Sequence, residues 1–128
     1  MKTIPNCPFC HDNIKSKTVA KLNSVMALED TSPVAPGHLL IIPKRHCMDF
    51  FHMTPEEQMD ANNLLTKLSR KILKDDPSVT GFNIGINNGE SAGQTIFHCH
   101  IHLIPRRDGD TPEPRGGVRG VIPDKMNY

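Results

Sequence analysis

The segment best suited to chemistry is a run of alternating histidines, His98-Cys99-His100-Ile101-His102-Leu103-Ile104. Alternate side chains of a β-strand share a face, so the three imidazoles are predicted on one face, about 6.5–7 Å apart. The intervening side chains are apolar and are expected to pack against a helix. Imidazole can act as a nucleophile, a proton shuttle or a metal ligand near neutral pH. A solvated His-rich face is the alternative without chemistry. A metal site made of all three is disfavoured because the strand would have to curve tightly.

A second candidate is the pair Cys7-x-x-Cys10, whose spacing suits two ligands of a tetrahedral zinc ion. The other two ligands must come from elsewhere, and the residues weighed are His46, the adjacent Cys47, and His98. A redox pair and two inert thiols are the alternatives, although a redox pair normally opens a helix after a strand. No secretory-type apolar stretch precedes the pair, so reduced thiols and a cytoplasmic location are expected.

The elements that must position these residues follow from the hydrophobic pattern. Thr54, Pro55 and Glu57 form the N-cap, first residue and capping box of a helix predicted over 54–74, with apolar residues at helical spacing. Short apolar or alternating runs predict five strands, at 19–22, 25–29, 38–43, 81–87 and 96–104. One long helix with a meander of about five antiparallel strands is an α+β fold.

Composition limits the remaining possibilities. The 128 residues suffice for one domain, with 37% hydrophobic and 23% charged residues and a net charge of +1. This charge favours neither a nucleic-acid surface nor a polybasic membrane patch, and no apolar run approaches the ~20 residues of a membrane span. Between 105 and 123, eight of nineteen residues are Pro or Gly, so an extended tail is expected there.

The residues also resemble a known family, the histidine triad or HIT proteins. Residues 98–104 match the motif His-φ-His-φ-His-φ-φ at every position, where φ is apolar. The segments 30–38 and 39–44, together with Asn87-x-Gly89 and Gly93-Gln94-Thr95, are similar to further blocks of that family. The resemblance covers residues 7 to 107. It implies a HIT domain over 1–107 with an N-terminal zinc knuckle, an extended tail over 108–128, and a two-fold dimer with one continuous sheet.

The resemblance implies a hydrolase that cleaves purine nucleotides at the α-phosphorus through a nucleotidyl-histidine. His100 matches the nucleophile, His102 matches a phosphate contact, and His38 matches the upstream active-site histidine. The further expected site residues are Gln94, near the phosphate and the catalytic histidines, and the nucleotide contacts Asp30, Asn87, Gly93 and Thr95. Asp30 and Asn87 could instead be simple turn residues, and Thr95 an ordinary strand threonine. Leu28 and residues near Ile14 are expected to line an apolar base pocket.

Related bacterial-type members imply the full zinc set Cys7, Cys10, His46 and His98. This would be one closed structural site per chain, leaving His100 free for chemistry, and no organic cofactor is expected. A nucleoside phosphoramidase is the favoured activity, with an AMP-type substrate. A dinucleoside polyphosphate hydrolase, a non-catalytic nucleotide-binding module and a zinc-stabilised interaction domain are the alternatives.

Overall fold

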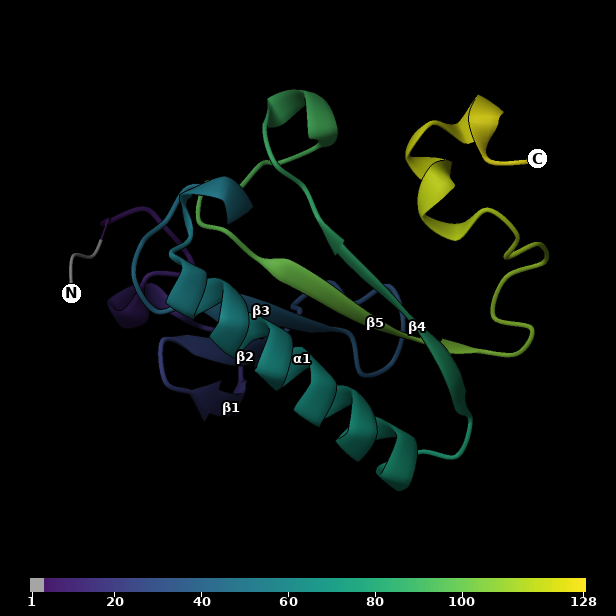
Figure 1. Cartoon of the computed structure of the whole chain (residues 1–128), viewed down its shortest axis with the longest axis horizontal. Coiled ribbons are helices and arrows are strands. Elements are labelled where there is room, and N and C mark those ends of the chain that lie inside the picture. The colour runs from purple at the N-terminus through teal and green to yellow at the C-terminus, as the bar shows by residue number, and fades with distance from the viewer. Residues whose placement is uncertain (1–3) are drawn as a thin grey trace.

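The computed structural model describes residues 4–128; Met1 to Thr3, the start of the predicted domain, lie outside the described residues. Five antiparallel strands form one sheet in the order β1-β2-β3-β5-β4, and the long helix α1 (Pro55–Asp75) crosses one of its faces (Figure 1). The predicted α+β class with five strands and one helix is confirmed.

The strand bounds are Thr18–Leu22 for β1, Val25–Glu29 for β2, Leu39–Pro43 for β3, Val79–Ile86 for β4 and Ile101–Arg107 for β5. The first three strands form a meander. The chain then crosses the sheet through α1, and β5 inserts between β3 and β4. The order therefore departs from the predicted simple meander, because the helical connection lets β4 pair at the outer edge of β5.

Helix α1 begins as the sequence predicts. The Thr54 side chain accepts from the Glu57 backbone N–H at 3.0 Å, and the Glu57 carboxylate accepts from the Thr54 backbone N–H at 2.8 Å. This capping box satisfies two of the donors that a helix start leaves unpaired. Ala61, Leu64 and Leu68 lie on the buried face of the helix, so α1 is fixed against the sheet.

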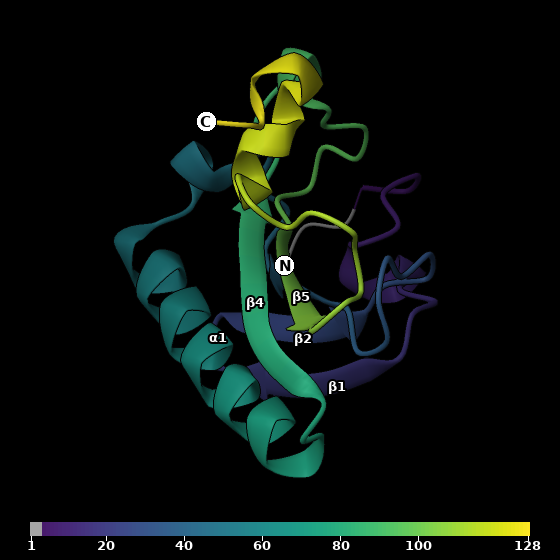
Figure 2. The same ribbon diagram turned by 90° about the vertical axis from the view of Figure 1, so that its right-hand side faces the viewer.

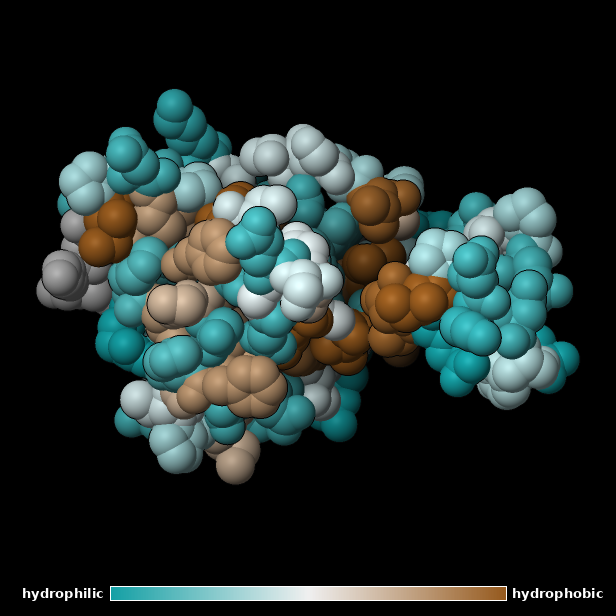
Figure 3. All heavy atoms as spheres, turned by 90° about the horizontal axis from the view of Figure 1, so that it is seen from above, coloured by the Kyte–Doolittle hydropathy of each residue, from teal (hydrophilic) through white to brown (hydrophobic). Residues whose placement is uncertain are grey.

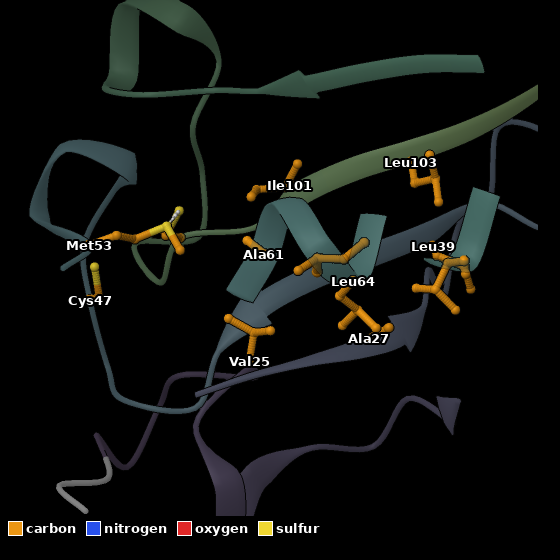
Figure 4. Close-up of a cluster of buried hydrophobic side chains, with 12 residues drawn as sticks. Val25, Ala27, Leu39, Cys47, Met53, Ala61, Leu64, Ile101 and Leu103 are labelled. Carbon is orange, nitrogen blue, oxygen red and sulfur yellow. Dashed lines mark hydrogen bonds between the residues drawn. The ribbon is translucent and has the colours of Figure 1, made fainter. Parts of the chain in front are cut away.

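Both faces of the central strands are covered, which explains why β3 is buried along its whole length. Between α1 and the sheet lies a core that includes Ala27, Leu39, Leu64 and Leu103 (Figure 4). On the opposite face, alternate residues of β2 and β3 pack against the N-terminal knuckle, defined as residues 7–16. Figure 2 shows α1 on one side of the sheet and the N-terminal segment on the other.

Two predicted segments differ in the structure. The predicted strand 96–104 begins only at Ile101, where pairing with both β3 and β4 starts. The chain before it is held by other bonds: the Cys99 N–H donates to the Cys47 carbonyl at 2.6 Å. Without a ladder partner, this extended segment is not a strand.

The prediction of a wholly extended tail is also wrong, because two short 3-10 helices, Gly117–Val121 and Pro123–Lys125, fold back on each other. Their turns need local bonds only, and Gly116 starts them at a positive φ of 93°. The division at residue 107 into a domain and a tail stays a prediction. Within residues 4–128, no helix combines the length and the apolar character needed to cross a bilayer.

Candidate active site and metal centre

The three histidines of the alternating run lie in different surroundings although they share one face of the chain. His98 is fully buried, whereas His100 and His102 are half-buried. The rings of His100 and His102 are adjacent, with centroids 5.3 Å apart. Cys99 and Ile101 point to the helix side, as the alternation predicts. The run therefore separates one buried ring from two that reach a cavity.

The proton on His100 can be placed from its neighbour. His100 Nδ1 lies 2.9 Å from the carbonyl oxygen of His98. A carbonyl oxygen only accepts, so Nδ1 of the neutral ring carries the hydrogen and donates it. The lone pair of His100 is then on Nε2, the atom that a nucleophilic imidazole uses.

A second chain of hydrogen bonds fixes His38 and His102. The Val34 backbone N–H donates to His38 Nδ1 at 3.1 Å, so His38 carries its hydrogen on Nε2. That Nε2 lies 2.9 Å from His102 Nδ1 and 3.4 Å from Asp30 Oδ2. His38 therefore donates to His102, which keeps its own hydrogen on Nε2. His102 thus offers a donor where His100 offers a lone pair.

Burial keeps this pair neutral. It lowers the pKa of His38, against the opposing charge of Asp30. Burial also lowers the pKa of His102, and the neighbouring His100 and His38 lower it further. The ligand atoms of Asp30, His38 and His102 lie within 4.8 Å of one another, but they are already joined by the contacts above. We therefore interpret Asp30, His38 and His102 as a hydrogen-bonded chain and not as a metal site.

His100 and His102 open onto a cavity of about 750 Å³, called cavity 1 here. Its walls are the knuckle, the Asp30–Ser32 turn, and the apolar side chains of Leu40 and Ile96. Ile14 lines it as expected, whereas Leu28 is fully buried beneath it. Asp30 accepts from the Ser32 N–H at 2.7 Å and also faces His38, so it is a turn residue and a cavity residue together.

In the loop before the triad, the Gln94 side chain is held by backbone groups. Gln94 is buried: its Oε1 accepts from the Gly89 N–H at 2.8 Å, and its Nε2 donates to the carbonyls of Met48 at 2.7 Å and Ile96 at 3.1 Å. These bonds brace the loop and leave no free end aimed at cavity 1.

The other predicted loop contacts are not brought together in cavity 1. Gly93 has a positive φ of 92°, and a Cβ there would contact the Asn87 amide. Thr95 is exposed. Asn87 lines a second cavity on the other side of His102.

The candidate metal centre unites the four expected ligands. One atom each from Cys7, Cys10, His46 and His98 lies within 4.8 Å of the other three. The Cys7 and Cys10 sulfurs lie 3.4 and 3.7 Å from His98 Nδ1, and the Cys10 sulfur lies 3.3 Å from His46 Nδ1. Two thiols and two imidazoles converging on one point fit a tetrahedral zinc ion.

The His98 ring is oriented for this role. Its Nε2 lies 2.8 Å from the Pro43 carbonyl, so Nε2 carries the hydrogen and the Nδ1 lone pair faces the thiols. Burial lowers the pKa of His98 to about 4, so the ring is neutral, as a metal ligand must be. Cys47 lies instead beside Met53 in the core under α1 (Figure 4), so it does not replace His46.

Sequence reasoning did not assign Phe9 to the site. Phe9 lies between the two cysteines in sequence, and its buried ring contacts His100 edge-on, with centroids 5.1 Å apart, and His98 at 6.1 Å. Its position inside the Cys7-x-x-Cys10 pair was the available signal. The Val34 N–H and the Pro43 carbonyl orient two of the histidines, and backbone groups carry no residue-type signal.

Comparisons with known proteins find one family and several relatives. Residues 11–109 match the family described as HIT domain. The chain is 38% identical over 109 residues to Protein hit of Bacillus subtilis, covering 83% of this chain and 74% of that protein. It is 36% identical over 108 residues to Adenylylsulfatase HINT3 of Arabidopsis thaliana, covering 82% of this chain and 54% of that one. It is 37% identical over 87 residues to an asymmetrical bis(5′-nucleosyl)-tetraphosphatase of Schizosaccharomyces pombe, covering 68% and 47%.

Solved structures show the same fold. A HIT family protein from Bacillus anthracis superposes with a TM-score of 0.75 at 40% identity, covering 84% of this chain and 78% of the other. A zinc-bound histidine triad family protein from Mycobacterium smegmatis superposes with a TM-score of 0.77 at 31% identity, covering 84% and 80%.

Proposed function

The chain belongs to the HIT domain family, and we propose that it is a purine nucleotide hydrolase that cleaves at the α-phosphorus through His100. The favoured bond is the phosphorus–nitrogen bond of a nucleoside 5′-phosphoramidate with an AMP-type nucleotide half. The observation that carries the proposal is the His100 ring, whose Nδ1–H is held by the His98 carbonyl so that the Nε2 lone pair is free. Relatives named as hydrolases of nucleotide compounds support this reaction class.

The proposed reaction has two balanced steps. His100 Nε2 attacks the phosphorus, a nitrogen–phosphorus bond forms, and the bond to the leaving amine breaks. The amine nitrogen keeps the electron pair and takes one proton from solvent by way of the His102 ring. Water then attacks the nucleotidyl-histidine, the bond to His100 breaks, and one proton returns to solvent with the release of nucleoside monophosphate.

The other residues bind and orient. His102 Nε2–H would donate to the developing charge on the phosphate, and His38 holds the His102 ring in that tautomer. The nucleoside would occupy cavity 1, with Asp30 beside the ribose hydroxyls. Gln94 is proposed as a positioning residue that braces the loop carrying Gly93 and Thr95 before the triad.

Zinc is proposed as a structural ion, one per chain, held by Cys7, Cys10, His46 and His98. When bound, zinc would be coordinated by all four side chains, with no position left for water. It would cross-link the knuckle to the segment before β5. The donor set supports this, as does the zinc-bound relative of known structure. The thiols agree with a reducing, cytoplasmic setting, which we also propose.

A two-fold homodimer is proposed through β4. This strand is eight residues long, lies at the edge of the sheet and carries the exposed Ile84. Pairing of two such edges would extend the sheet and cover unpaired backbone groups. Light scattering coupled to size exclusion should give twice the monomer mass.

The second candidate function is hydrolysis of dinucleoside polyphosphates. The relative named as a tetraphosphatase favours it, and the second cavity beside His102 has room for another group at about 800 Å³. A non-catalytic nucleotide-binding module is the outcome if neither substrate turns over.

The test is AMP release from adenosine 5′-phosphoramidate, with diadenosine tetraphosphate in parallel. His100→Ala should lower turnover by more than roughly 10⁴-fold. His52→Ala is the control, because His52 is an exposed histidine paired to Asp49 outside both cavities. Alkaline quenching of wild type should trap a nucleotidyl adduct on His100 by mass spectrometry. A folded His100→Ala protein with undiminished turnover would overturn the proposal.

A further inference from the structure

A third cavity, called the α1 cavity here, lies between the C-terminal half of α1 and the strands β1 and β3, with a volume of about 500 Å³. Its walls carry aliphatic side chains from all three elements, namely Leu64, Leu68, Ile72, Val19, Ala20 and Leu39. No aromatic side chain is among the described residues that line it. A space of this size with aliphatic walls suits the alkyl part of a small molecule.

The β1 wall depends on an irregularity in strand pairing. Thr18 pairs with Leu28 and Ala20 pairs with Ala27, so Val19 is the extra residue of a β-bulge. A bulge re-aims side chains that would otherwise alternate, and the consecutive residues Val19 and Ala20 both line the α1 cavity. Val19 is 39% exposed on this edge strand, so the cavity is open to solvent there.

The α1 cavity is separate from the site of the triad. His38 Nε2 lies 2.9 Å from His102 Nδ1, whereas the next residue, Leu39, belongs to the core between α1 and the sheet. Cavity 1 and the α1 cavity share no lining residue. They therefore lie on opposite faces of the sheet, and a molecule in the α1 cavity would not touch the histidines.

The α1 cavity also stays accessible in the proposed dimer. Hydrophobic residues gather where the body of the molecule meets the tail (Figure 3), but the exposed Ile84 there belongs to the β4 edge that the dimer would cover. The β1 edge is the opposite edge of the sheet, and no residue of β4 lines the α1 cavity. Its mouth is thus available for a ligand in either oligomeric state.

The two carboxylates at the α1 cavity already have cationic partners. Lys71 Nζ lies 2.6 Å from the Asp75 carboxylate, and the Arg107 guanidinium lies 2.9 Å from the Asp76 carboxylate. These pairs cancel each other's charge. They leave no free carboxylate, among the described lining residues, to attract a cationic ligand.

Two further lysines make the surroundings of the α1 cavity positive. Lys67 of α1 and Lys21 of β1 both line it and are exposed. Within residues 4–128, neither ammonium group has a carboxylate at ion-pair distance. An anionic group at the rim would therefore meet uncommitted positive charge, while a cationic one would be repelled.

We propose that the α1 cavity binds a medium-chain carboxylate, with its alkyl chain between α1 and β1 and its carboxylate at Lys67. The aliphatic walls select the chain, and the uncommitted lysines select the sign of the headgroup. This binding site uses neither cavity 1 nor the triad. It therefore does not depend on the proposed hydrolase activity.

The first test titrates decanoate, decylamine and acetate into the full-length, metal-loaded protein labelled with ¹⁵N, followed by amide NMR. Decanoate should bind with one equivalent per chain and shift the amides of Val19, Gly37 and Leu68, while those of Asp30 and Ser32 at cavity 1 stay in place. Decylamine, which has the same chain and a positive headgroup, should bind about tenfold more weakly, and acetate should not bind.

Equal affinities for decanoate and decylamine, or shifts confined to cavity 1, would overturn this inference. Neither outcome affects the hydrolase proposal, because no turnover is measured. Conversely, a protein that cleaves no nucleotide but binds decanoate at these amides would refute the proposed function and support the α1 cavity.

Charge variants test the headgroup contact. Lys67→Gln should weaken decanoate binding about fivefold, because an exposed ion pair is lost. Lys74→Gln is the matched control, since it removes the same charge from an exposed position of α1 that lines none of the cavities described. Equal affinities in these two variants would overturn the assignment of the carboxylate to Lys67.

A second pair of variants tests the alkyl contact. Val19→Ser should also weaken decanoate binding about fivefold, because apolar contact area is lost. Leu73→Ser is the control, since Leu73 is an exposed apolar residue of α1 outside the cavities described. Thermal melting checks that both variants are folded. Wild-type affinity in a folded Val19→Ser protein would show that the alkyl chain lies elsewhere.

Discussion

Backbone groups set the proton positions on the histidines that matter here. The His98 carbonyl leaves the lone pair of His100 on Nε2, and the Val34 N–H leaves a hydrogen on His38 Nε2. A nucleophile and a donor are thus ready in the neutral state, before any substrate binds. The residue types could be predicted from the triad pattern, whereas the tautomers depend on contacts between distant segments.

His38 should make stability depend on pH. Burial lowers its pKa below the ordinary 6.5, against Asp30, and His102 is the other group that faces it. As pH falls below 6.5, the unfolded chain binds a proton that the folded protein does not, so stability is lost with acid. The free energy of unfolding, measured in urea from pH 7.5 to 5.5, should fall less steeply in His38→Asn than in wild type.

The His38→Asn side-chain oxygen can keep the bond from the Val34 N–H, so the variant is expected to fold. The control is His52→Asn, an exposed position whose substitution should leave the slope unchanged. If the free energy of unfolding depends on pH equally in wild type and His38→Asn, protonation of His38 does not contribute to the pH dependence of stability.

At the scale of elements, local sequence patterns predict helix ends and buried faces well, but they do not predict which strands pair. The capping box and apolar stripe place α1 within one residue of its observed ends. The alternation at 98–103 correctly predicts which side chains face the core. It cannot show that β3 and β4 pair with β5 only from Ile101 onward, because ladder partners lie far away in sequence. Gln94 shows the same limit, since one of its partners, the Met48 carbonyl, lies 46 positions away in another loop.

Glu57 should be the most sensitive position at the start of α1. Its carboxylate accepts from the Thr54 N–H and from two nitrogens of Arg45, at 2.8 and 3.2 Å, and it is almost fully buried. Glu57→Ala removes the carboxylate half of the capping box and takes an acceptor from the Thr54 N–H and from Arg45, so it should lower the free energy of unfolding by about 2 kcal/mol. Urea denaturation measures this change.

Glu56→Ala is the matched control for that variant. Glu56 also lies in the first turn but is exposed, so its substitution should cost only about 0.5 kcal/mol through the helix dipole. Equal losses from the two variants would mean that helix electrostatics, and not the Arg45–Glu57–Thr54 contacts, dominates.

At the scale of the whole molecule, two small segments complete a sheet that α1 covers on one face only. The knuckle covers the other face near His98 and forms one wall of cavity 1, while the tail forms a wall of the second cavity beside His102. The spacing of Cys7-x-x-Cys10 predicts two of the four metal ligands. The other two, His46 and His98, could be predicted only from the family resemblance. Ligands separated by up to 91 positions are brought together by the fold and not by spacing.

Zinc should therefore stabilise the entire molecule. The purified protein is expected to carry one zinc per chain by plasma mass spectrometry, and chelation should lower Tm by about 10 °C or more. Cys7→Ser should lose the metal and melt as the chelated wild type does, because the knuckle is then released from His98. Cys47→Ser should retain one zinc, since Cys47 is a buried thiol on the opposite face of the sheet. Zinc retained at full stoichiometry by Cys7→Ser, or lost from Cys47→Ser, would show that the ion is bound at another site. In that case zinc would not fix the position of the knuckle that lines cavity 1.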